Sequence, residues 1–140
     1  MSAVSFVSEQ TDFSLSNQNQ FIDWLAFVCQ AEGKTLAELT YIFCTDEYLL
    51  AINKKHLSHD YYTDVITFDY SDEKSISGDI FISVDRVREN AITEQVSEGD
   101  EMARIIVHGL LHLLGYNDKT PSQKDEMTLK EDFYLSSRAF

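Results

Sequence analysis

Proline, cysteine and basic residues are scarce in this chain, and each shortage excludes a class of protein. The only proline is Pro121, and no Pro- or Ser-rich linker or internal repeat divides the sequence. The two cysteines, Cys29 and Cys44, lie in apolar surroundings without a Cys-x-x-Cys pair, and they are too few for a disulfide framework. We expect both thiols to be reduced and buried in the core.

Long hydrophobic runs are also missing. The longest nearly uniform apolar stretch, residues 105–114, contains two histidines and a glycine and is too short to span a bilayer. Residues 1–16 have neither the basic segment nor the continuous apolar segment of a secretory signal peptide. These features predict a cytoplasmic protein without a membrane partner.

Positive charge is the third shortage. There are 11 Lys and Arg residues against 24 Asp and Glu residues, and the formal net charge is −13. A protein that coats nucleic acid nonspecifically needs a basic surface to bind phosphates. The composition therefore argues against a protein that coats nucleic acid nonspecifically. It remains compatible with a local basic groove.

The abundant residues indicate a packed globular protein. Hydrophobic residues make up 44% of 140 residues, and nine are Phe, which suits one domain over residues 1–140. Apolar alternation predicts strands near residues 3–7, 39–45, 64–70 and 79–84, with residues 71–78 as a polar connection. Helical spacing predicts helices near residues 17–31, 46–56, 85–95, 100–114 and 122–135, the first capped by Ser16 and ended by Gly33. The order predicts an α+β fold, with a small, mostly four-stranded sheet against about five helices.

The segment His-Gly-Leu-Leu-His-Leu-Leu-Gly-Tyr-Asn-Asp, residues 108–118, has the spacing of a metal site. His108 and His112 are four residues apart in an apolar helical run, so both imidazoles lie on one helix face. Gly115 then suits the left-handed position that ends a helix, and the reversal brings Asp118 beside the two rings. Two His and one carboxylate leave a fourth tetrahedral position open, as in catalytic rather than structural zinc sites. We expect one zinc ion per chain at the end of this central helix.

An alternative explanation is that both histidines are core residues whose ring nitrogens are hydrogen-bonded within the protein, and that Gly115 is only a helix cap. The added glycine and third ligand, at the zincin spacing, favour a metal. Peptide-cleaving zincins carry a Glu general base directly after the first His, where this chain has Gly109. That absence weakens a peptidase interpretation but leaves metal-assisted hydrolysis intact.

These residues resemble the YbeY-type bacterial rRNA maturation endoribonucleases, formerly grouped as metalloprotease-like proteins. The family motif is His-Gly-x-Leu-His-Leu-x-Gly-Tyr-Asp-His, which residues 108–116 match before Asn117 and Asp118 replace Asp-His. Residues 63–68 (Thr-Asp-Val-Ile-Thr-Phe) and 78–83 (Gly-Asp-Ile-Phe-Ile-Ser) resemble two further family blocks, in the family's order and spacing after Asn53. The resemblance covers about residues 41–127.

The resemblance implies a small α+β domain with one catalytic zinc. It also implies cleavage of single-stranded RNA in ribosomal RNA 3′-end maturation and ribosome quality control, with ribosomal RNA and the ribosome or its subunit as partners. Two departures stand out. The third ligand is Asp118 rather than His, which lowers the charge of the site and favours harder ions. The family's Arg a few residues after the equivalent of Asn53 is replaced by Leu57.

Residues 53–62 are the one local reversal of the acidic bias, with two Lys, two His and two Tyr. Lys54, Lys55 and His59 could neutralise phosphates, and tyrosines could stack on unpaired bases. The alternative is a solvated helix end, where Lys complements the helix dipole. The family resemblance favours substrate contact.

Two aspartates are candidates to orient a ligand imidazole, because such rings donate their other N–H to a carboxylate or a carbonyl. They are Asp64 and Asp79, and a turn-capping role is equally compatible with each. The chain is therefore interpreted as a zinc-dependent endoribonuclease. The rivals are a metallopeptidase-like hydrolase and a non-catalytic ribosome-assembly factor with a structural metal. The sequence leaves open the oligomeric state and whether water or the ribose 2′-OH attacks.

Overall fold

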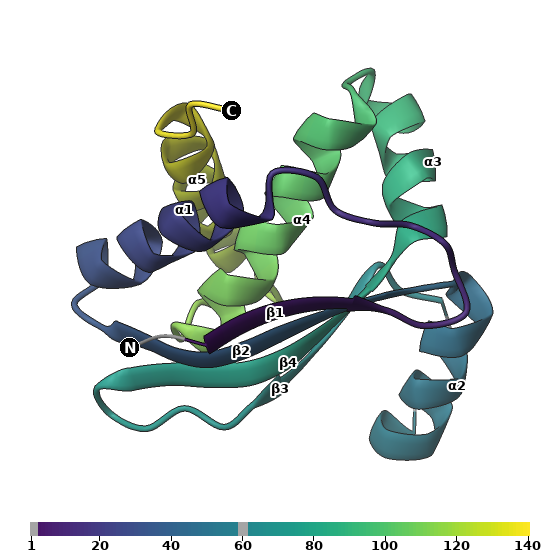
Figure 1. The fold of residues 1–140 in the computed structure, drawn as a ribbon, viewed down its shortest axis with the longest axis horizontal. Coiled ribbons are helices and arrows are strands. Elements are labelled where there is room, and N and C mark those ends of the chain that lie inside the picture. The colour runs from purple at the N-terminus through teal and green to yellow at the C-terminus, as the bar shows by residue number, and fades with distance from the viewer. Residues whose placement is uncertain (1–2, 59–61) are drawn as a thin grey trace.

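A computed structural model describes residues 3–58 and 62–140 of the chain. The elements are, in order, β1 (Ala3–Ser8), α1 (Gln18–Ala31), β2 (Thr35–Cys44), α2 (Asp46–Leu57), β3 (Val65–Asp69), β4 (Ser75–Ser83), α3 (Val84–Glu94), α4 (Glu98–Leu113) and α5 (Pro121–Ser136). Within the described ranges, four strands and five helices form an α+β fold (Figure 1), which confirms the predicted fold class. None of the helices in those ranges is both long and apolar enough to cross a membrane.

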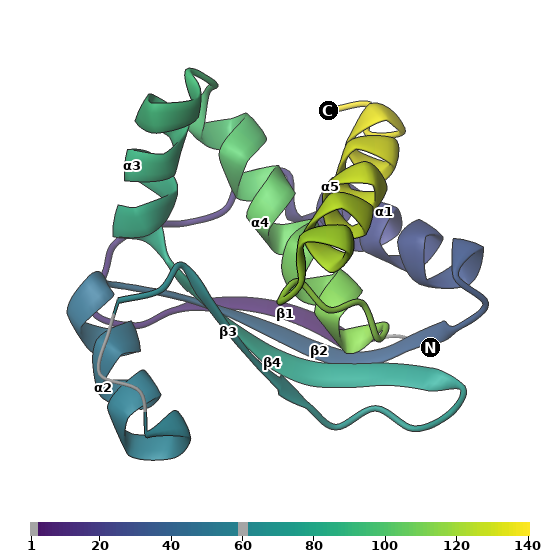
Figure 2. The same cartoon turned by 180° about the vertical axis from the view of Figure 1, so that it is seen from behind.

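The strands form one mixed sheet in the order β1-β2-β4-β3. The β1–β2 and β2–β4 pairs are parallel, whereas β3 runs antiparallel to β4 and forms an edge of the sheet. Helices α1, α3, α4 and α5 lie on one side of the sheet, and α2 lies on the other (Figures 1 and 2). The sheet therefore separates α2 from the layer that contains α4 and α5.

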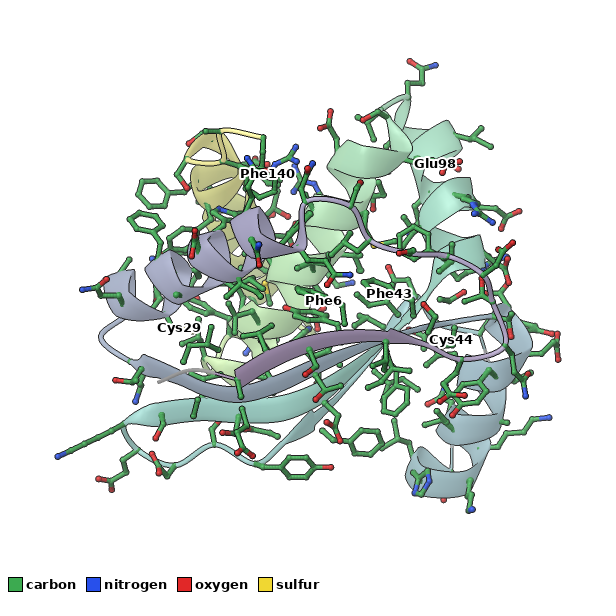
Figure 3. All side chains as sticks on the ribbon, viewed as in Figure 1. Phe6, Cys29, Phe43, Cys44, Glu98 and Phe140 are labelled. Carbon is green, nitrogen blue, oxygen red and sulfur yellow. The ribbon has the colours of Figure 1, made fainter. Side chains whose placement is uncertain are left out.

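The main hydrophobic core fills the space between the sheet and the larger helical layer. Fully buried side chains such as Ile80 of β4 and Leu110 of α4 meet there. Figure 3 shows Phe6 and Phe43, from neighbouring strands, pointing into this layer, with ring centroids 6.4 Å apart. A separate cluster around Leu49 and Ile66 packs α2 on the other face. The core thus fixes α4 tightly on β4, which positions the site described below.

The two cysteines are buried and free, as expected. Burial, reinforced by nearby carboxylates, raises the pKa of both Cys29 and Cys44 to about 12. Their thiols are therefore protonated near neutral pH, and their role in the described structure is packing.

Three predicted boundaries need correction. β2 begins at Thr35 and β4 at Ser75, each four residues before its predicted start, because these segments pair with each other in parallel register. Helix α1 is not capped by a Ser16 side chain. Its N-cap is Asn17 in the left-handed conformation without a side-chain cap hydrogen bond. Gly33, with φ +77°, follows the end of α1 as predicted.

Candidate metal centre

Helix α4 presents His108 and His112 on one side, one turn apart. The spacing of four residues stacks the two side chains on one helix face. Their ring centroids are 4.6 Å apart, and the ring planes are inclined by 84°. The exposed fractions of the two side chains are 16% and 23%. The rings are therefore held by the fold on one side and open to solvent on the other.

The chain reverses at Gly115, directly after α4. Gly115 has φ +105°, in the left-handed region that favours glycine. Its N–H donates to the His112 carbonyl, and the Tyr116 N–H donates to the Leu111 carbonyl, both at 3.0 Å. This pair of bonds is the Schellman arrangement of a helix C-terminus. The predicted helix stop is confirmed, and it turns the next residues back toward the two rings.

Asp118 is held in place by contacts on both sides of it in the chain. Before it, the Tyr116 hydroxyl donates to Glu32 Oε1 at 2.6 Å. After it, Thr120 caps α5: its hydroxyl accepts from the Gln123 N–H at 3.2 Å, and the Gln123 side chain accepts from the Thr120 N–H at 3.1 Å. The carboxylate thus stands in a short segment fixed at both ends, a preset position for a ligand.

Three donor atoms converge at the end of α4. His108 Nε2 and His112 Nε2 are 3.0 Å apart, and Asp118 Oδ2 lies 3.3 Å and 3.2 Å from them. In a tetrahedral zinc site with bonds of about 2.0–2.1 Å, ligand atoms are separated by roughly 3.3 Å. Two nitrogen lone pairs and a carboxylate oxygen this close repel each other unless a proton or cation lies among them. The group could therefore hold a metal ion.

Glu131 of α5 contacts the other ring nitrogen of His108. Its Oε2 lies 2.6 Å from His108 Nδ1, while its Oε1 accepts a hydrogen bond from Arg104 Nη1 at 2.7 Å. Sequence reasoning missed this residue. A signal was present, because Glu131 shares the buried face of α5 with Met127 and Tyr134, at helical spacing. A carboxylate in helical register with two buried side chains calls for a partner in the core.

The two imidazoles have opposite pKa shifts. For His108, burial lowers the pKa, but the hydrogen bond and charge of Glu131, with the charges of Asp64 and Asp118, outweigh it and raise the pKa above 6.5. For His112, burial and then the neighbouring His108 lower the pKa below 6.5. His108 is therefore protonated before His112 as the pH falls, and a metal ion bound at the two Nε2 atoms requires both rings to be neutral.

Asp64 and Asp79 take other partners. Asp64 precedes β3, and its Oδ2 accepts from Asn90 Nδ2 at 3.3 Å; it reaches His108 only through its charge. Asp79 accepts from the Tyr70 hydroxyl at 3.2 Å. The next residue on β4, Ile80, faces α4, so Asp79 leaves the sheet on the opposite face. Among the described residues, the carboxylate contact with a ring nitrogen that was expected of these two aspartates is made by Glu131.

Comparison with known proteins identifies the family. The model of the family described as Endoribonuclease YbeY matches residues 4–139. The chain belongs to this family. An Endoribonuclease YbeY of Cytophaga hutchinsonii is 49% identical over 138 residues, which are 98% of this chain and 96% of the relative. Another, of Flavobacterium johnsoniae, is 49% identical over 123 residues, which are 88% of each chain.

A solved structure supports the fold. The solution structure of TM1509 from Thermotoga maritima aligns with a TM-score of 0.66 over 95% of this chain and 87% of that one, at 22% sequence identity. At that identity the likeness concerns the fold alone. It agrees with the α+β arrangement of Figure 1.

Two glycines of the YbeY motifs have a packing reason. A Cβ at Gly109 would lie 2.8 Å from Ile80 Cγ2, and a Cβ at Gly78 would lie 2.5 Å from the Phe68 carbonyl oxygen and 2.9 Å from Leu113 Cδ1. All three distances are shorter than real Cβ atoms tolerate. These glycines let α4 lie close against β4, with Gly109 directed at the sheet rather than at the metal group.

Lys54 and Lys55 of this YbeY-family chain lie away from the metal group. Lys54 and Lys55 are exposed near the end of α2, on the opposite side of the sheet from α4 (Figure 2). Leu57, which the sequence analysis singled out as a departure from the family, ends α2 with 40% of its surface exposed. His59 lies outside the described residues. The structure therefore brings together His108, His112 and Asp118, but not the lysines.

Proposed function

We propose that this chain is a zinc-dependent endoribonuclease specific for single-stranded RNA. It acts in ribosomal RNA 3′-end maturation and ribosome quality control, as one metal-dependent hydrolase domain over residues 1–140. The observation that carries the proposal is the convergence of His108 Nε2, His112 Nε2 and Asp118 Oδ2 within 3.3 Å, in a chain of the Endoribonuclease YbeY family. The proposed partners are ribosomal RNA and the ribosome or its subunit, and the proposed location is the cytoplasm, where those partners are.

The donor set suits zinc. Neutral imidazole and carboxylate are both regular zinc ligands, and three protein ligands leave one position for water or substrate. When bound, the ion supplies Lewis acidity toward a phosphoryl oxygen and lowers the pKa of a coordinated water. A carboxylate in place of the family's third imidazole lowers the charge of the site and favours harder divalent ions relative to three histidines.

The protein side chains hold and orient this site. His108 and His112 come from one rigid helix, and Asp118 comes from a segment fixed at both ends. Asp118 has 38% of its side chain exposed, so substrate can approach from that side. The arrangement suits attack on the phosphodiester by water or by the ribose 2′-OH.

RNA approach is restricted by charge. With a net charge of −13, most of the surface repels phosphate, and Lys54 and Lys55 are an exposed exception. The edge strand β3 offers an RNA strand a path between the lysines and the metal group, because β3 contacts both α2 and α4. We propose that Lys54, Lys55 and His59 contribute to binding along such a path.

Two rival functions are disfavoured by particular observations. A metallopeptidase of the zincin type needs a Glu at position 109, but that position faces Ile80 in the core and has no room for a side chain. A purely structural metal is disfavoured because, among the described residues, three candidate ligands converge rather than four, and the site is partly exposed.

One experiment separates the three functions. Cleavage of single-stranded ribosomal RNA fragments is measured in parallel with casein cleavage, before chelation, after chelation, and after zinc is added back. RNA cleavage that is lost with chelator and restored by zinc supports the endoribonuclease. Casein cleavage with the same dependence supports the peptidase. Zinc binding without either activity supports the assembly factor.

A further inference from the structure

A chain of polar contacts links the buried side of His108 to helix α5. Arg104 and His108 are one turn apart on α4, and both contact the same carboxylate, that of Glu131. Only 8% of the Glu131 side chain is exposed. The second arm of the arginine, Arg104 Nη2, donates to Asp132 at 2.6 Å, so α5 holds the guanidinium with two acidic residues.

We propose that Glu131 is the positioning residue of the metal site, and that Arg104 fixes Glu131 in the orientation that His108 requires. This inference rests on the metal site of the proposed function. Glu131 does not belong to the ligand group. It acts through the imidazole, because the nitrogen it contacts is the one that points away from His112 and Asp118.

The geometry fixes the tautomer of His108. With Nδ1–H donating to Glu131 Oε2, the lone pair of Nε2 is directed at the point shared with His112 Nε2 and Asp118 Oδ2. A carboxylate in this position also makes the imidazole a stronger ligand. If the ring carried its proton on Nε2 instead, a metal ion would lose one of its three protein ligands.

The role of Arg104 follows from the burial of Glu131. A buried carboxylate is costly without a compensating charge, and Arg104 supplies that charge at Oε1 while leaving Oε2 for the histidine. The guanidinium reaches Glu131 and Asp132 through different nitrogens. It therefore restricts rotation of the Glu131 carboxylate as well as neutralising it.

The docking of α5 consequently sets two of the three ligands. Its first turn fixes the segment that carries Asp118, through the Thr120 cap. Its third turn, through Glu131, fixes the ring of His108. Metal affinity should therefore depend on a residue of α5 that never touches the ion.

The test measures metal affinity in the full chain, with cobalt(II) as a spectroscopic probe and zinc by competition with a chelator. Three variants are compared with wild type: E131A, E131Q and R104Q. Glu126→Gln is the matched control, because Glu126 is exposed on the same helix and undergoes the same change. Melting temperature in excess chelator reports the stability of each metal-free protein separately.

We expect E131A to weaken zinc binding by about 10–100-fold and to change the cobalt absorption spectrum. E131Q keeps an oxygen that accepts from Nδ1–H, so it should retain part of the affinity and the wild-type spectral shape. R104Q should weaken binding less than E131A, because the Glu131 carboxylate remains. E126Q should match wild type.

Three outcomes overturn the inference. If the E131 variants melt lower in chelator but bind cobalt and zinc as wild type does, Glu131 has only a structural role. If E131A does not fold, R104Q and E131Q decide, and wild-type affinity in both contradicts the proposal. A wild-type chain that binds neither metal removes the metal site itself, and the proposed function with it.

Discussion

Replacing Gly109 by alanine tests how closely α4 lies against the sheet. The new Cβ would stand 2.8 Å from Ile80 Cγ2 and 3.2 Å from Ile80 Cδ1. Carbon atoms in contact prefer about 3.5–4.0 Å, so the helix or the isoleucine must move. Ile80 is fully buried in the main core, where there is little free space for such a shift.

Two opposing effects determine the magnitude. Overpacking of this kind costs about 1–3 kcal/mol. Alanine gains about 1 kcal/mol over glycine in a helix interior. The net change expected for G109A is a loss of about 0–2 kcal/mol in the free energy of unfolding. Gly99 provides the control on the same helix, because its Cβ would meet only Ser97 Oγ at 3.9 Å. G99A should be neutral or stabilising by up to about 1 kcal/mol.

A double-mutant cycle isolates the contact. I80A alone should cost about 2–5 kcal/mol, because it leaves a cavity in the core. In G109A/I80A the new methyl group has space, so the double variant should be more stable than the sum of the single effects, by about 1 kcal/mol or more. Urea unfolding followed by far-UV circular dichroism, in chelator so that metal does not contribute, measures all four proteins. Additive effects, or G109A as stabilising as G99A, would refute the close contact between α4 and β4.

Three further predictions concern ligation, RNA binding and acid stability. Zinc titration of chains with His, Asp, Asn or Ala at position 118 should give zinc retention in the order His ≈ Asp > Asn > Ala. If the Asn variant retains zinc as well as wild type does, Asp118 forms the turn and is not a ligand. K54A/K55A should weaken RNA affinity and reduce its salt dependence by roughly one unit per lost phosphate contact, with zinc content and melting temperature unchanged. Burial raises the pKa of Glu32, but hydrogen bonds from two tyrosines and Lys130 lower it overall, below 4.5; its stabilisation is therefore present above that pH and is lost as pH falls through the folded-state pKa. E32Q should lower the free energy of unfolding by about 1–3 kcal/mol at pH near 7. On acidification below pH 4.5 the variant should lose less stability than wild type, and urea unfolding at neutral and at acidic pH measures both effects.

Local features of the sequence predicted the three-residue group well. A helix places residues four apart on one face, and a glycine after an apolar run ends the helix. The convergence of His108 and His112 with Asp118 therefore follows from about one helical turn and the chain reversal after it. The fold class followed for a similar reason, because most helices and strands carry clear apolar periodicity. These features depend on neighbours in the chain, which the sequence displays directly.

The features that were missed depend on partners far away in the chain. The early parts of β2 and β4 carry one core side chain each, Leu36 and Ile76. They are strands because they pair with each other across the sheet. Glu131 contacts a histidine 23 residues before it, and only the packing of α5 on α4 brings the two together. The expected contact of Asp79 with a ligand imidazole was missed for a different reason, since its partner is the Tyr70 hydroxyl. Strand alternation with Ile80 could have placed Asp79 on the α2 side, had the facing of β4 been known.

The position of the site at the end of α4 follows from two levels of this structure. The candidate metal-binding atoms come from α4 and the segment after it, and the orientation of His108 depends on α5. The closeness of α4 to the sheet depends instead on Gly78 and Gly109. A substitution at either glycine would shift α4 relative to β4, but α5 packs on α4 and would move with it. We therefore expect such variants to lose folding stability before they lose metal affinity, whereas variants of Glu131 should show the reverse order.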